Sequence, residues 1–86
     1  MRLDRYLSVA KIFKSRSLAA EAISESMVYV DGLVAKAARE IKPGQKIEID
    51  TPRFYKKIEV SFLPQGNVSR KEASSLYKLL EERIKD

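Results

Sequence analysis

Residues 28–35 read VYVDGLVA, and this short stretch decides the fold class. Val28 and Val30 alternate with Tyr29, which is the pattern of a strand that buries one face. Asp31-Gly32 then separates this run from a second β-forming run. An Asp-Gly pair favours the tight hairpin turn in which both central residues have positive φ. The stretch therefore predicts a β-hairpin with a two-residue loop, and it places Tyr29 on the outer face.

Two further strands are expected after the hairpin. Residues 42–45, KPGQ, form a turn signal because proline presets φ and glycine accepts the left-handed conformation. Residues 46–50 alternate again, and a last strand is expected over residues 53–62, after the break at Thr51-Pro52. The apolar residues that should face the core are Ile47 and Ile49 in the first of these strands, and Ile58, Val60 and Phe62 in the second.

Two helices are expected before the hairpin. Apolar residues at positions 3, 6, 7 and 10 have helical spacing and predict a helix over residues 2–10. The polar segment 14–17 interrupts the chain, and Ser15 can cap a second helix that runs to about Glu25. Arg16 then occupies the first helical position beside Lys14. The expected buried residues of this helix are Ala19, Ala22 and Ile23.

The C-terminal part has the signals of a third helix. Ser69 and Glu72 have the spacing of a capping box, in which each side chain satisfies a backbone donor of the other residue. The apolar residues that follow at helical spacing are Ala73, Leu76, Tyr77, Leu80 and Ile84. They predict an amphipathic helix that packs on the sheet, with docking of a partner protein as the alternative. The expected fold class is α+β, with two N-terminal helices on a small twisted antiparallel sheet, plus a C-terminal helix.

Positive charge is concentrated near the N-terminus. The 86-residue chain has a net charge of +5, and residues 1–16 carry five basic side chains against one acid, Asp4. Residues 17–50 carry four basic and six acidic side chains. A local positive field attracts polyanions, so the N-terminal helices are the expected nucleic-acid-binding surface. Its candidate residues are Arg2, Asp4, Arg5, Lys11, Lys14 and Arg16.

Asp4 is the one acid in this group, and its role has several explanations. Its carboxylate could orient an arginine through a salt bridge, or it could accept a hydrogen bond from a ribose 2′-OH or a base. A surface ion pair with a structural role is at least as good an explanation. The arginines themselves can hold a phosphate through two parallel hydrogen bonds.

Catalytic and metal-binding constellations are missing from the sequence. The chain has no cysteine and no histidine, so the common nucleophile, general base and metal ligands are absent. The three glycines lie apart in separate turns and form no phosphate-binding loop. We therefore expect no enzyme, no cofactor and no metal. No signal peptide or membrane span is expected either, which favours a cytoplasmic location.

A second basic segment leaves two interpretations open. Phe54-Tyr55 lies between Arg53 and Lys56-Lys57, and interleaved aromatic and basic residues are typical of proteins that bind single-stranded nucleic acid. The alternative is an edge strand that its lysines protect from pairing with other chains.

The ordered motifs of the N-terminal half resemble a known RNA-binding domain. They are RLDRYL at 2–7, KSRS at 14–17 with Ala20, VYVDG at 28–32, VAK at 34–36 and KPGQKI at 42–47. Together they are similar to the domain named after small-subunit ribosomal protein S four, also called the αL motif. Members usually have Asn before the hairpin glycine, and Asp31 keeps the same turn chemistry. The division that follows is an αL-type domain over 1–62, with a loop and the helix over 63–86.

The length of the chain and the KEASSLY segment at 71–77 resemble the RqcP family, formerly called YabO, which is related to ribosome-associated heat-shock proteins. This resemblance implies binding to large-subunit ribosomal RNA and to obstructed peptidyl-transfer RNA on large ribosomal subunits. It also implies work beside RqcH, which adds alanine tails to stalled chains, and a monomeric protein. A heat-shock-type factor that recycles such subunits without tailing is the alternative. By motif position, Arg2, Asp4 and Arg16 carry the RNA contacts, and Arg5, Lys11 and Lys14 support them.

Overall fold

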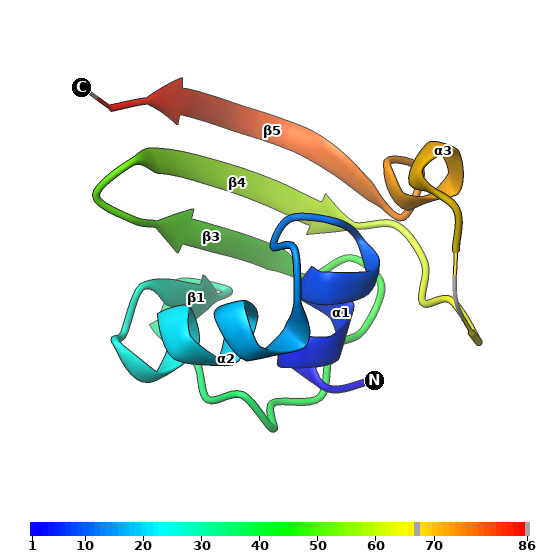
Figure 1. The fold of residues 1–86 in the computed structure, drawn as a ribbon, viewed down its shortest axis with the longest axis horizontal. Helices are drawn as coiled ribbons and strands as arrows, with labels where there is room; N and C mark the ends of the chain where they lie inside the picture. Colours follow the sequence, from blue (N-terminus) through cyan, green and yellow to red (C-terminus); the bar gives the residue numbers. More distant parts are fainter. Residues whose placement is uncertain (67, 86) are drawn as a thin grey trace.

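The computed structural model describes residues 1–66 and 68–85, and Figure 1 shows the order of their elements. Within these residues no helix has the length and apolar character needed to cross a membrane. Along the chain the elements are α1 (Leu3–Val9), α2 (Arg16–Ser24), β1 (Val28–Val30), β2 (Leu33–Val34), β3 (Lys46–Asp50), β4 (Phe54–Val60), α3 (Arg70–Ala73) and β5 (Tyr77–Ile84).

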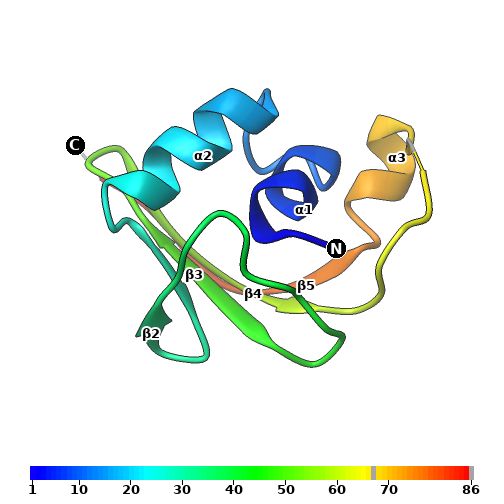
Figure 2. The same cartoon turned by 90° about the horizontal axis from the view of Figure 1, so that it is seen from below.

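The strands form one antiparallel sheet in the order β2-β1-β3-β4-β5. Figure 2 shows the three helices on the same side of this curved sheet. The pairing of Val30 with Leu33 closes the predicted two-residue hairpin. Asp31 and Gly32 have φ values of 51° and 84°, as the tight turn requires. The α+β class, the two N-terminal helices and the antiparallel sheet are therefore confirmed.

The core lies between the helices and the sheet, because each element buries only one side. Helices α1 and α2 contribute the predicted apolar stripes, and β3 contributes both of its isoleucines. Tyr29 lies between two buried valines of β1 and is itself only partly buried, on the other face. The fully buried large side chains are Leu3, Tyr6, Leu7, Val28, Val30, Ile41, Ile47, Ile49, Ile58, Val60 and Leu76.

Both N-terminal helices end in the same way, without a glycine. Lys11 and Ser26 have positive φ values of 60° and 61°. Each directly follows the C-cap residue of its helix, and the amide groups of these residues and of their successors bond back to carbonyls of the last turn. This is the Schellman arrangement, in which glycine is the usual residue because it has no Cβ. At the other end of α2, the Ser15 hydroxyl accepts the predicted bond from the Leu18 amide at 3.2 Å.

The predicted C-terminal amphipathic helix is wrong. Helix α3 ends at Ala73, and residues 77–84 form strand β5, which pairs with β4 over its whole length. The free edge of β4 offers a row of backbone donors and acceptors, and pairing with it outweighs local helix preference. A docking module built on a long C-terminal helix is therefore excluded for the described residues. The capping box itself is present: the Ser69 hydroxyl accepts from the Glu72 amide at 3.2 Å.

The end of the predicted fourth strand also differs from expectation. Strand β4 stops at Val60, and Phe62 is 48% exposed instead of facing the core. The chain turns away here because the Ser61 and Phe62 amides both donate to the Leu76 carbonyl oxygen. The hydroxyl of Tyr6 donates to the same oxygen at 2.8 Å. Residue 76 thus joins α1 to the end of β4, and burial raises the pKa of Tyr6 above its ordinary range.

Candidate RNA-binding site

Asp4 lies in the first turn of α1, where the positive end of the helix dipole favours a carboxylate. The residue is only 4% exposed. Its Oδ1 accepts a hydrogen bond from the Arg5 amide at 2.8 Å. The side chain is therefore fixed by the backbone of its own helix before any arginine approaches it.

Two arginines from different elements meet at this carboxylate. Nε of Arg2 lies 3.3 Å from Oδ1 of Asp4, and Nη2 of Arg2 donates to Oδ2 at 3.3 Å. Nε of Arg16, at the start of α2, lies 3.2 Å from the same Oδ2. The side chains of Arg2 and Arg16 are 48% and 50% exposed, so one side of each guanidinium stays open to solvent. A buried acid thus holds two half-exposed guanidinium groups in place.

This geometry favours the explanation in which Asp4 orients arginines through salt bridges. Arg2, Arg16 and the Arg5 amide already occupy both carboxylate oxygens. A carboxylate that is this deeply buried has little surface for a 2′-OH or a base. Its observed contacts are those of a positioning group for the arginines.

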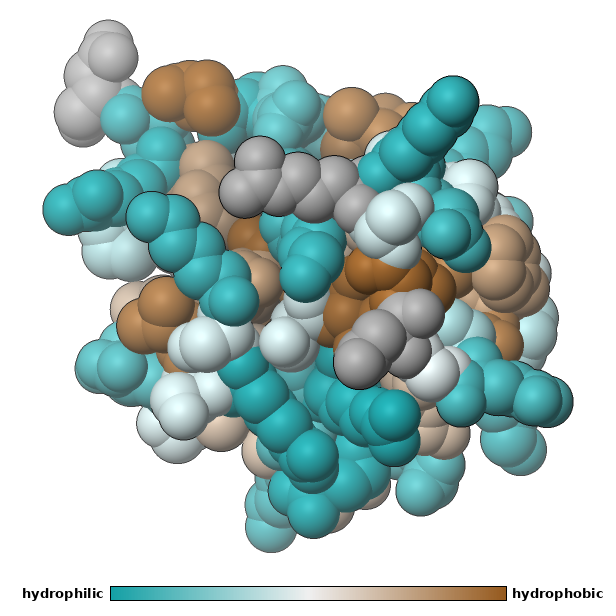
Figure 3. Space-filling model, turned by 45° about the vertical axis from the view of Figure 1, so that its right-hand side comes forward, coloured by the Kyte–Doolittle hydropathy of each residue, from teal (hydrophilic) through white to brown (hydrophobic). Residues whose placement is uncertain are grey.

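The remaining candidates lie apart from the Asp4 cluster. Arg5, Lys11 and Lys14 are exposed, on α1 and on the connection between α1 and α2. Within the part of the chain that the structure describes, none of the three side chains forms an ion pair. Figure 3 looks at the side on which α1 and α3 come forward, and hydrophilic residues cover most of it. These cations are free to meet a diffuse polyanion but are not preorganised as Arg2 and Arg16 are.

Two further basic residues, Lys36 and Arg39, lie near the start of α1, although they fall outside the basic segment 1–16. The Leu3 amide donates to the Arg39 carbonyl at 2.8 Å, and the Asp4 amide donates to the Ala37 carbonyl at 3.3 Å. These bonds hold segment 36–39, with exposed Lys36 and Arg39, against the start of α1. The sequence offered one signal for this segment, because Lys36 is the last residue of the VAK motif at 34–36.

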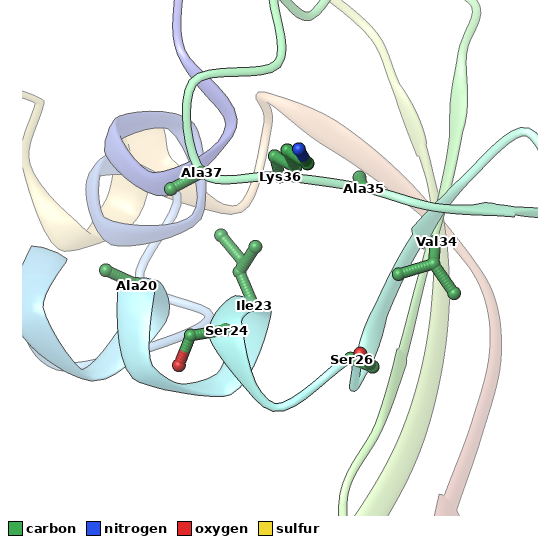
Figure 4. Close-up of a pocket in the computed structure, with 8 residues that line it drawn as sticks. All are labelled: Ala20, Ile23, Ser24, Ser26, Val34, Ala35, Lys36 and Ala37. Carbon is green, nitrogen blue, oxygen red and sulfur yellow. The ribbon is translucent and has the colours of Figure 1, made fainter.

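A shallow hollow adjoins this segment, between α2 and residues 34–37 (Figure 4). Its volume is about 390 Å³, and Ala20, Ile23 and Ser24 line its α2 side. Lys36 is the one charged residue among those that line it. Its small side chains and its single cation would allow the close approach of a sugar–phosphate backbone. Among the described residues, no three carboxylate side chains gather as metal ligands.

Tyr55 and Lys56 are engaged by neighbouring side chains within the sheet. The Tyr55 hydroxyl donates to Glu48 at 2.6 Å, and the Arg83 guanidinium lies 4.6 Å from the Tyr55 ring centroid. That hydrogen bond, followed by burial, raises the pKa of Tyr55 to about 12. Lys56 points to the helix side and pairs with Glu82 at 3.1 Å. Phe54 and Tyr55 therefore face opposite sides of the sheet and do not form one stacking platform.

Comparison with known proteins agrees with this architecture. Residues 1–47 match the S4 domain family. The RQC P-site tRNA stabilizing factor of Bacillus subtilis is 30% identical over 82 residues, which are 95% of this chain and 94% of that protein. The factor of the same name from Streptococcus pneumoniae is 34% identical, over 95% of this chain and 92% of that protein.

The fold has a solved counterpart as well. The trimeric structure of Vibrio cholerae Heat Shock Protein 15 superimposes with a TM-score of 0.86 at 28% identity, covering 93% of this chain and 81% of that one. The sequence relatives match nearly from end to end, and the family match runs from α1 to the first residues of β3. The chain therefore belongs to the S4 domain family and, within it, to the RqcP family of RQC P-site tRNA stabilizing factors.

Proposed function

We propose that this protein is a non-catalytic RNA-binding factor of ribosome quality control. It binds large ribosomal subunits that carry an obstructed peptidyl-tRNA, contacts both ribosomal RNA and the tRNA, and works as a monomer in the cytoplasm. In this role it steadies the tRNA beside RqcH while alanine tails are added. The names of its relatives support the quality-control role and the tRNA contact.

The observation that carries the proposal is the pair of arginines fixed by Asp4. Two guanidinium groups that a buried carboxylate holds 3.2 to 3.3 Å away lose little conformational freedom when they bind phosphates. Arg5, Lys11, Lys14, Lys36 and Arg39 extend the positive surface around them. Such a surface reads the shape and backbone of an RNA, as a site on folded ribosomal RNA requires.

The likeness to Heat Shock Protein 15 supports a second candidate, namely recycling of stalled large subunits without tailing. The two roles share the RNA surface and differ in their effect on RqcH. A reconstituted tailing reaction separates them. Stimulation of alanine addition supports the first role, and the absence of any effect on tailing supports the second.

Sedimentation of cell extract on a sucrose gradient tests the proposal. We expect the tagged wild type in the large-subunit fraction together with peptidyl-tRNA, and the folded Arg2→Ala/Arg16→Ala variant at the top. The matched control is Lys78→Ala/Arg83→Ala, which removes the same charge from the exposed strand β5 and should still co-sediment. Wild type at the top would contradict the ribosomal role, and co-sedimentation of the Arg2/Arg16 variant would contradict the site.

A further inference from the structure

An open groove of about 720 Å³ runs along the other flank of α2, between this helix and the β3–β4 turn. Its size is within the range of small-molecule sites. Its apolar surface comes from Ile12, Phe13, Leu18, Met27 and Phe54. Leu18 is 46% exposed, so the groove presents apolar surface to solvent and is not an extension of the core.

Two aromatic rings form part of this surface. The centroids of Phe13 and Phe54 are 6.4 Å apart, and the ring planes are tilted by 50°. Both side chains are half-buried, which holds the rings in place while an edge or a face remains accessible. Lys56 Nζ lies 5.8 Å from the Phe54 ring centroid and occupies one side of that ring. A flat aromatic group can stack against such fixed rings at small entropic cost.

Charged residues of both signs line the groove. Lys14 and Arg53 supply cations, and Glu21 and Glu25 supply carboxylates. None of these four side chains takes part in an ion pair among the residues that the structure describes. A nucleotide can use both kinds of group, because its phosphate pairs with cations, and the ring N–H or exocyclic amino group of its base can donate to a carboxylate.

We propose that this groove binds one unpaired nucleobase of the RNA that lies across α1 and α2. The inference rests on the proposed function, because Lys14 belongs both to that RNA surface and to the groove. An RNA strand that leaves Lys14 reaches Phe13 and Leu18 directly. Because the two ring planes are tilted by 50°, the base stacks on the face of one of the two rings and contacts the other at an angle, and Lys14 and Arg53 hold the flanking phosphates. The protein thereby gains a preference for RNA with an extruded base over continuous duplex.

Two RNA hairpins test the inference at low salt: one with a single bulged 5-iodouridine and one with the same nucleotide paired. We expect the wild type to bind the bulged hairpin about tenfold more tightly, as stacking of one base on aromatic side chains provides. Phe54→Leu and Phe13→Leu keep apolar bulk but remove a ring, so they should abolish the preference without changing the affinity for the duplex. Irradiation of the wild-type complex should crosslink the iodinated base to Phe13 or Phe54.

Leu18→Ala should reduce the preference severalfold, while the control Leu79→Ala, at a position of similar exposure on β5, should leave it intact. Equal wild-type affinity for the two hairpins, or crosslinks only outside the groove, would overturn the inference and leave the proposed function standing. Arg2→Ala/Arg16→Ala should weaken binding of both hairpins alike. If the wild type binds neither RNA, the proposed function itself fails. The crosslink needs no variant, so misfolding of a phenylalanine variant does not remove the test.

Discussion

At the scale of single residues, Asp4 combines two roles, since it is a buried charge and it positions two arginines. The charge-assisted bonds from Arg2 and Arg16 compensate the loss of hydration that burial imposes on the carboxylate. Asp4→Asn keeps one acceptor oxygen but removes the charge that attracts both guanidinium groups. We expect it to lower the free energy of unfolding by about 1–3 kcal/mol, measured by urea denaturation.

The same substitution at Asp50 provides the matched control. Asp50 pairs with Lys85 on the exposed surface, where an ion pair contributes roughly 0–1 kcal/mol. Asp50→Asn should therefore change stability little and RNA affinity not at all. Equal losses of stability in the two variants would show that the Asp4 cluster behaves as an ordinary surface pair.

Tyr55 gives a prediction about alkaline pH. The hydrogen bond to Glu48 raises its pKa from 10.0 to about 12, so the folded state favours the protonated phenol. The resulting stabilisation is fully present below pH 10 and is lost as the pH rises through about 12. The phenolate absorbance of wild type minus that of Tyr55→Phe should show a midpoint near pH 12. Glu48→Gln should move this midpoint downward, and an unmoved midpoint would exclude Glu48 as the cause.

At the scale of elements, the ends of α1 and α2 carry backbone strain in residues that are not glycine. Ser26 has φ 61°, a region that costs a side-chain-bearing residue roughly 1 kcal/mol. Ser26→Gly should therefore raise the free energy of unfolding by about 0.5–1 kcal/mol, measured by thermal and urea denaturation. Ser24→Gly, inside the last turn of α2, is the control and should destabilise.

The elements also show where sequence reasoning succeeds and where it fails. The hairpin was predictable because Asp31-Gly32 fixes its turn locally, and α1 and α2 were predictable from apolar spacing and the Ser15 cap. Strand β5 was not, because its conformation depends on β4, which is distant in sequence. The register shift opposite Lys57 and Ile58 leaves Leu80 unpaired with β4 and interrupts the alternation of β5. In the sequence, Leu76, Leu80 and Ile84 have the four-residue spacing that is typical of a helix.

The candidate site likewise has features that the sequence predicts and features that it does not. The basic character of the first 16 residues is visible in the sequence. The convergence of Arg2 and Arg16 on one buried carboxylate depends on how α1 packs against α2, and no local pattern encodes that packing. Arg39 was missed because segment 36–39 meets α1 through backbone bonds, which leave no trace in side-chain composition.

Strand β5 leads to a further expectation at this scale. A fragment that ends at Phe62 lacks β5 and Leu76, so it exposes buried Ile58 and Val60 at a new sheet edge. We expect this fragment to show no cooperative thermal unfolding, followed by circular dichroism. The contribution of the C-terminal segment to binding must therefore be tested with point variants. A sharp transition in the fragment would show that residues 1–62 fold alone.

At the scale of the whole molecule, the charge distribution predicts how binding responds to salt. About three to five phosphate contacts give a slope of roughly −2 to −4 in a plot of log affinity against log salt concentration. Removing Arg2 and Arg16 together should flatten this slope by about 2. Titration of RNA at several salt concentrations measures both values. A slope near zero for the wild type would mean that phosphates contribute little to its binding.

The bond from the Tyr6 hydroxyl to the Leu76 carbonyl spans 70 residues of sequence. Helix α1 precedes Leu76 on the nascent chain, so its packing is completed only after the segment that contains Leu76 has left the ribosomal exit tunnel. A contact of such long sequence separation slows folding, because a long loop must close before the contact forms. The RNA-binding surface that we propose on α1 is therefore not fully supported until the segment that contains Leu76 has been synthesised.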